Sequence, residues 1–338
     1  MTNYFRESNG DLAPLFENLL SIGVEFRVAG SKSVGLALMQ PLRCPECSKP
    51  LALVILGLPF MLLLFRLQSI FVSMIDQWEI SPEANNMTRE RISWHEAGDT
   101  QVRQLVLGLE MYLGDRDVTF EGLEELLRGL DASDQHAKRS LLDALRLAES
   151  WVVAHEFFHA CLLAGNGGPF PQFATILESN QEVIACASRY CDPVTKKLGL
   201  QPNVAKAWLE EFQADILACK MLVIAIADRR FGASDDVNAP AKDVRFHSAR
   251  AVLNGAAAAF EAIYWVDVQR KATISLKQLQ TASHPPSNLR WELITGYTKA
   301  LIDTTDDSLF KTTELVAQLS SSLARAYQAS HPRLDLIL

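Results

Sequence analysis

The segment 155–159 (H-E-F-F-H) carries two histidines and a glutamate within a sequence of helical periodicity. Histidines four apart on a helix project from the same face, so both imidazoles can reach one zinc ion at roughly 2.0–2.1 Å. Glu156 follows the first histidine directly, where it can act on water rather than bind the metal. The segment therefore predicts His155 and His159 as zinc ligands and Glu156 as the general base of peptide hydrolysis.

A second pair of residues lies in the segment 210–215 (E-E-F-Q-A-D), within the next long helical pattern. Glu211 and Asp215 are four apart and share one helix face. A catalytic zinc site uses three protein ligands, and a histidine ligand usually donates its other ring N–H to a supporting acceptor. We therefore predict Glu211 as the third ligand and Asp215 as that acceptor. The alternative is a solvated acidic face, but the apolar residues at 216–218 indicate that Asp215 points inward.

A third element is the turn 283–286 (S-H-P-P), which Arg290 follows on the next helix. Two prolines make the turn rigid and favour a helix start after it. His284 and Arg290 could bind a substrate carbonyl or stabilise the oxyanion that forms during attack. Taken alone, the turn is more typical of a helix cap than of a substrate-binding element.

The order H-E-x-x-H, E-x-x-A-D and H-P-P-x-x-x-x-R resembles the HtpX-type gluzincin metallopeptidases over residues 151–297. The resemblance implies a zincin-like catalytic domain with one Zn²⁺ ion. It also implies a cleft bordered by His284 and Arg290, ligands His155, His159 and Glu211, the base Glu156 and the supporting Asp215. The chain departs from that family in lacking several clear membrane spans, and S-N-L at 287–289 replaces the usual acidic residues.

The chain is also similar to the soluble Lit family of phage-exclusion peptidases, in the order of the motifs and in the position of H-E-x-x-H. That resemblance implies a cytoplasmic protease that stays inactive until infection and then cleaves a folded host protein, such as a translation factor. A regulatory partner is compatible with it.

The elements that must position these residues predict an α+β fold that is predominantly helical. We expect an N-terminal α+β portion at 1–115 and a helical gluzincin catalytic domain at 116–338. The expected strands are 23–28, 33–39 and 50–56. The expected helices are 58–80, 120–130, 137–163, 203–230 and 248–269, followed by two helical stretches that end near residue 329.

The apolar stretch 51–75 could instead be a membrane anchor. A bilayer crossing needs about 20 apolar residues, and a charge near its centre costs roughly 2.5–3.5 kcal/mol. Arg66 lies near that centre and begins a polar stripe at helical spacing, which favours a strand and a core helix. The members of the stripe are Arg66, Ser69, Ser73, Asp76 and Gln77.

Composition limits the class of protein further. Of the 338 residues, 49% are hydrophobic and 21% charged, which is typical of globular proteins. The net charge of −8 is spread along the chain, so nucleic acid is not an expected partner. Six cysteines and no secretory signal favour a reducing, cytoplasmic setting.

Other cysteines and histidines of the chain give weaker signals. Cys44 and Cys47 resemble half of a zinc ribbon, whose other half could only be Cys186 and Cys191, so ordinary thiols are favoured over a second zinc. The other four histidines lack partners at ligand spacing; they are His95, His136, His247 and His331. We expect the aromatic residues near the motif to pack around its helix; these are Phe157, Phe158, Phe170 and Phe173.

Together these patterns predict a zinc-dependent endopeptidase that acts on a protein substrate. Two alternatives stay open at this point. One is a membrane-anchored quality-control protease, and the other is a non-catalytic sensor or scaffold that zinc stabilises.

Overall fold

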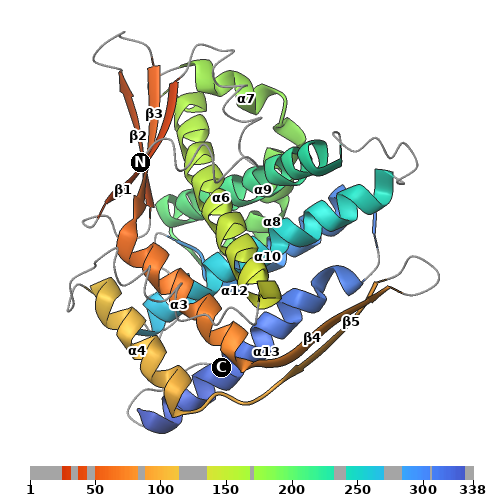
Figure 1. The fold of residues 1–338 in the computed structure, drawn as a ribbon. Coiled ribbons are helices and arrows are strands. Elements are labelled where there is room, and N and C mark those ends of the chain that lie inside the picture. Colours follow the sequence, from red (N-terminus) through yellow and green to blue (C-terminus); the bar gives the residue numbers. More distant parts are fainter. Residues whose placement is uncertain are drawn as a thin grey trace.

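Long helices make up most of the protein, and two small β-sheets lie beside them (Figure 1). The computed structural model describes residues 25–31, 37–43, 50–82, 88–113, 135–167, 171–231, 241–269, 284–304 and 307–331. The strands are β1 (Glu25–Ser31), β2 (Ala37–Arg43), β3 (Pro50–Gly57), β4 (Ile75–Pro82) and β5 (Thr88–Trp94). The longer helices are α3 (Leu58–Met74), α4 (Asp99–Leu113), α6 (Gln135–Gly165), α8 (Gln181–Leu198), α9 (Pro202–Phe231), α10 (Ala241–Gln269), α12 (Ser287–Leu301) and α13 (Lys311–Ser330). The short ones are η2 (Pro171–Phe173), α7 (Ala174–Glu178) and η3 (Asp307–Phe310). The predicted α+β, mainly helical class is confirmed; the zincin-like fold stays a prediction.

The three-stranded sheet has β3 at its centre, between β1 and β2. β1 pairs with β3 in parallel, with Val28 opposite Val54, and β2 pairs with it antiparallel, with Met39 opposite Val54. The apolar run of β3 suits this central place. The strand predicted at 50–56 is confirmed to within one residue, whereas β1 and β2 begin later than the predicted 23 and 33.

Helix α3 follows β3 directly, with Pro59 in its first turn. The predicted end at residue 80 is wrong, because the chain leaves the helix at Met74 and enters β4. Asp76 and Gln77 therefore belong to a strand and not to a helical stripe. Pairing of β4 with β5 across a hairpin overrides the local helical pattern. Within the described residues, no helix has the length and apolar character needed to cross a membrane.

Four helices build the region that holds the predicted chemistry, and α6 runs through its middle with α9, α10 and α12 around it (Figure 1). α6 and α10 approach closely at Gly255, where an added Cβ would lie 2.6 Å from the backbone carbon of Leu147. The helices predicted at 137–163 and 203–230 are confirmed to within two residues at each end. α10 starts at Ala241 rather than at the predicted 248, so the expected loop at 234–242 ends earlier.

Helices α4 and α8 and the β4–β5 hairpin were not predicted. α8 carries Pro193 inside it, a residue that normally indicates a helix end, and Gly199 closes it in a left-handed conformation with φ of 63°. The helix predicted at 120–130 lies outside the described residues.

One hydrophobic core spans both portions of the chain. It includes Leu63 and Phe71 of α3 as well as Trp151 of α6 and Trp265 of α10. The boundary predicted near residue 115 also lies outside the described residues, and the division into two portions stays a prediction.

Candidate metal centre

Helices α6 and α9 bring His155, His159 and Glu211 together, as the two sequence patterns predicted. The Nε2 atoms of the two histidines lie 3.0 Å apart. Oε2 of Glu211 lies 3.4 Å from Nε2 of His155, and Oε1 lies 3.3 Å from Nε2 of His159. One donor atom from each residue falls within 4.8 Å of the others. Two residues one turn apart on α6 and one residue on α9 therefore form the cluster.

This donor set fits a zinc ion. Two ligands about 2.0–2.1 Å from a tetrahedral zinc stand roughly 3.3–3.4 Å apart, close to the 3.0, 3.4 and 3.3 Å between these donor atoms. Oε2 of Glu211 is buried, and Nη1 of Arg290 lies 3.3 Å from it, but it accepts no hydrogen bond within the part of the chain that the structure describes. A cation held between this oxygen and the imidazoles would satisfy it. Two imidazoles and one carboxylate are also a donor set of catalytic zinc sites.

Asp215 supports the first histidine from below. Its Oδ1 lies 2.9 Å from Nδ1 of His155, and the Asp215 side chain is fully buried. The two atoms are within hydrogen-bond distance, and the carboxylate of Asp215 raises the pKa of His155 against the effect of burial. The structure therefore brings Asp215 to the ring nitrogen that faces away from the cluster, where an acceptor can orient His155.

Arg290 lies beneath the donors, and only 5% of its surface is exposed. Its Nε and Nη2 donate to the two carboxylate oxygens of Asp215 at 2.8 and 2.7 Å. Its Nη1 lies 3.3 Å from Oε2 of Glu211, and Nη2 lies 3.4 Å from Nε2 of His155. The expected place at the cleft edge is therefore wrong, because the first turn of α12 faces α9 and turns this guanidinium inward.

His284 lies on the open side of the cluster. Its Nε2 is 3.4 Å from Oε1 of Glu211, while 66% of its side chain is exposed. Pro285 is buried and Pro286 caps α12, so the rigid turn fixes the backbone next to His284. The structure thus brings His284 to the cluster and leaves it accessible.

Glu156 is half-buried on α6, next to His155. Its charge contributes to the field at Arg290 and raises the pKa of that guanidinium, although less than Asp215 and Glu211 do. It is not one of the three clustered donors, so it is available for the predicted role of a base that acts on water.

Burial and charge oppose each other in this cluster. Burial alone would raise the pKa of Glu211 and of Asp215, but Arg290 and His155 hold both pKa values below their ordinary range, and His159 also lowers that of Glu211. Burial alone would lower the pKa of His155, but Asp215 and Glu211 outweigh it and raise that pKa to about 9. Both carboxylates are therefore ionised at neutral pH, as metal binding requires.

Two aromatic residues that the sequence analysis did not single out complete the surroundings. Trp151 stacks on His155 with ring centroids 5.2 Å apart. Phe260 of α10 meets the Trp151 ring edge-on at 4.8 Å. Trp151 precedes His155 by one helical turn, which is a signal of a shared face. Phe260 carries no such signal, because only the packing of α10 on α6 brings it here.

The other residues weighed in the sequence lie away from the donors. His95 pairs with Asp76 at 2.9 Å, His247 meets Phe246 edge-on, and Nδ1 of His331 lies 3.1 Å from the carbonyl of Tyr327. Cys186 and Cys191 are free thiols on α8. Cys44, Cys47 and Phe170 lie outside the described residues, as does the side chain of His136.

The three phenylalanines near the motif behave as predicted. Phe157, Phe158 and Phe173 are buried, and Phe157 meets the other two edge-on at 5.4 and 5.8 Å. They belong to the hydrophobic core around α6.

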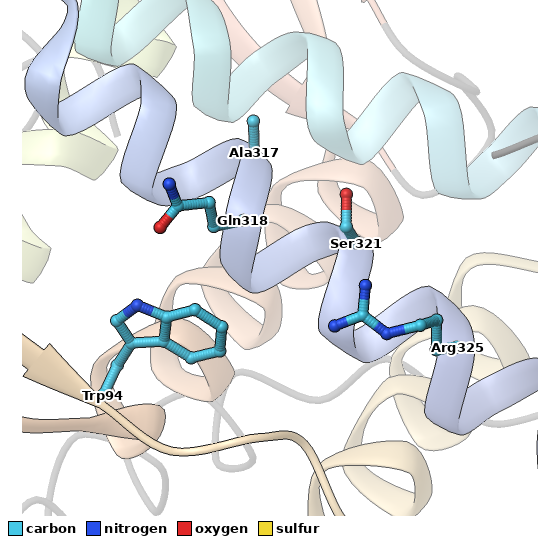
Figure 2. A pocket seen from close by; sticks show the side chains of 5 residues that line it. All are labelled: Trp94, Ala317, Gln318, Ser321 and Arg325. Carbon is cyan, nitrogen blue, oxygen red and sulfur yellow. The ribbon is translucent and has the colours of Figure 1, made fainter.

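A hollow of about 370 Å³ lies apart from the cluster, between the end of β5 and α13 (Figure 2). Trp94 faces Ala317, Gln318, Ser321 and Arg325 of α13 across it. None of the described residues that line it carries a carboxylate, an imidazole or a thiol.

Comparison of the chain with models of protein families, with curated proteins and with solved structures found no match.

Proposed function

We propose that the protein is a zinc-dependent endopeptidase of the gluzincin type. The observation that carries this proposal is the convergence of His155, His159 and Glu211, with Glu156 beside the first of them. The same cluster is open on one side, where His159 is 27% exposed and His284 is 66% exposed. In this proposal a peptide approaches the cluster past these two side chains.

Each residue has a role in this proposal. A zinc ion held by His155, His159 and Glu211 would supply a Lewis acid for a peptide carbonyl and for the attacking water. Glu156 removes a proton from that water and delivers it to the leaving amine. His284, exposed at the mouth of the site, contacts the substrate. Asp215 and Arg290 keep the donors oriented.

Changing Glu156 to Gln tests the proposal, because the amide keeps the shape of the side chain and loses its basicity. We expect an unchanged zinc content and a loss of casein cleavage of about 10²–10⁴-fold. Zinc is measured by atomic absorption and cleavage by release of labelled peptides, with a chelator control on the wild type. Glu178→Gln on α7 is a matched control. Undiminished, chelator-sensitive cleavage by the Glu156→Gln protein would remove Glu156 from the role of base.

The similarity of its motifs to those of the Lit family supports two finer parts of the proposal. We propose a cytoplasmic setting and an intracellular protein substrate whose cleavage awaits a trigger. Fractionation of expressing cells tests the setting. A comparison of cellular peptides between wild type and Glu156→Gln, with and without phage infection, tests the trigger. Recovery of the chain in the membrane fraction would favour the quality-control alternative instead.

A further inference from the structure

We propose that Arg290 is a positioning residue that holds the metal donors in place, and that Trp151 and Phe260 in turn hold Arg290. This inference rests on the proposed metal site and assigns to three residues a role that the motif pattern does not give them. It does not require that the site hydrolyse peptides.

The guanidinium joins the two carboxylates of α9 through separate edges. The edge formed by Nε and Nη2 faces Asp215 at 2.8 and 2.7 Å, and Nη1 faces Oε2 of Glu211 at 3.3 Å. Asp215 in turn contacts His155. One planar group on α12 therefore fixes a ligand directly and a second ligand through Asp215.

The rings explain why the guanidinium stays there. Its central carbon lies 5.0 Å from the centre of the Phe260 ring and 5.8 Å from that of Trp151, within the range of cation–π attraction. Trp151 also stacks on His155, so one indole contacts both the positioning cation and a metal ligand. The two rings meet edge-on and form an aromatic wall that α6 and α10 contribute together.

A role in contacting substrate does not fit this placement. Arg290 is nearly inaccessible, and the donors of both its edges face carboxylates. A planar fork is required for that arrangement, and a lysine ammonium cannot reproduce it. Arg290→Lys therefore keeps the charge and removes the geometry.

Zinc affinity of the metal-free protein is the decisive measurement, by competition with a chromogenic chelator. We expect Arg290→Lys to bind zinc at least tenfold more weakly, the usual effect of losing a partner of a metal ligand. Phe260→Leu keeps the fork and weakens only its support, so we expect a loss of about three- to tenfold. The d–d absorption of bound Co²⁺ should change in Arg290→Lys, because displaced donors alter the ligand field.

Two matched controls separate this role from general damage. Arg325→Lys changes an exposed arginine that also pairs with a carboxylate, and Phe310→Leu removes a ring under Lys299 at 4.7 Å. Both should bind zinc within twofold of wild type. If circular dichroism shows that Arg290→Lys is unfolded, the zinc affinity of Phe260→Leu decides the test.

Wild-type or tighter zinc affinity together with an unchanged Co²⁺ spectrum in the folded variants would overturn the inference. Tighter binding would mean that Arg290 acts chiefly by repelling the metal. The outcome is independent of peptide hydrolysis. Weaker zinc binding by the variants, without any cleavage by the wild type, would retain this inference and reject the peptidase. Cleavage by the wild type, with unchanged zinc binding by the variants, would reject this inference and retain the peptidase.

Discussion

The molecule contains an arginine–carboxylate pair in its interior and another on its surface. Arg290 and Asp215 are almost completely buried, at 2.7 and 2.8 Å, whereas the Arg325 and Glu96 side chains are 54% and 67% exposed, with contacts of 3.1 and 3.3 Å. Water screens the surface pair and competes for its hydrogen bonds, but it cannot replace a lost partner in the interior. Loss of one partner should therefore destabilise the protein more in the interior pair than in the surface pair, although the chemical groups are the same.

A third carboxyl sharpens the contrast. Glu261 of α10 accepts a hydrogen bond from the hydroxyl of Ser320 on α13, which is a neutral group. The residue is partly exposed, yet burial of its carboxyl group raises the pKa to about 7. Asp215 is also buried, and its pKa is lowered, because Arg290 and His155 supply positive charge. The partner decides the direction of the shift.

The largest effect should come from Asp215→Ala. It leaves Arg290 buried without the carboxylate that both its Nε and Nη2 contact, which costs about 3–5 kcal/mol of unfolding free energy for a broken buried pair. Urea unfolding of the chelator-treated protein measures this without a contribution from bound metal. Asp215→Asn, which keeps the shape and one oxygen acceptor, should lose less. A loss below 1 kcal/mol in Asp215→Ala would show that the interior pair is no stronger than the surface one.

Sequence patterns predicted the donors of this interior cluster, but they did not predict that Arg290 is buried beneath them. His155 with His159, and Glu211 with Asp215, follow from the repeat of a helix, which is a local property. The burial of Arg290 depends on how α12 packs against α9 and α10, and Phe260 is more than a hundred residues from Trp151. Contacts of that range leave no periodic signal in the chain.

The same limit explains the errors in the fold. The apolar pattern of α3 continues into Ile75, and only the pairing of Ile75 with Trp94 shows that a strand has begun. The polar stripe predicted from Arg66 to Gln77 therefore extended past the end of the helix. Gly255, at the close contact of α6 with α10, has meaning only once both helices are in place.

An intermediate effect is expected for Glu261→Gln, and it should depend on pH. The folded-state pKa of about 7 lies above the ordinary 4.5, so the folded protein keeps a proton that the unfolded chain releases. Stability contributed by that proton is complete below pH 4.5 and is lost as the pH rises towards 7. Glutamine is neutral throughout. We expect the variant to match wild type at pH 4.5 and to be more stable by about 1–2 kcal/mol at pH 8, after allowance for partial exposure.

Urea unfolding of both proteins at the two pH values gives the difference directly, and other titrating groups cancel in it. Ser320→Ala is a useful companion. Loss of its hydrogen bond should raise the pKa of Glu261 further and widen the pH dependence. A Glu261→Gln protein with the same advantage at both pH values would place the ordinary pKa, and not a raised one, in the folded state.

The smallest effect is expected on the surface, for Glu96→Gln. The hydrogen bond from Ser322 and then the contact with Arg325 lower the pKa of Glu96, so any stability it contributes is lost only as the pH falls through the acidic range. At pH 7 the urea midpoint should not change measurably, either at low ionic strength or in 1 M salt, because both charges are hydrated. Ser322 is 1% exposed, and its Oγ accepts from the backbone N–H of Ala97 at 2.9 Å. Ser322→Ala should therefore cost about 1 kcal/mol, the net value of a buried hydrogen bond. If Glu96→Gln proved more damaging than Ser322→Ala, exposure would not be what separates the two arginine pairs.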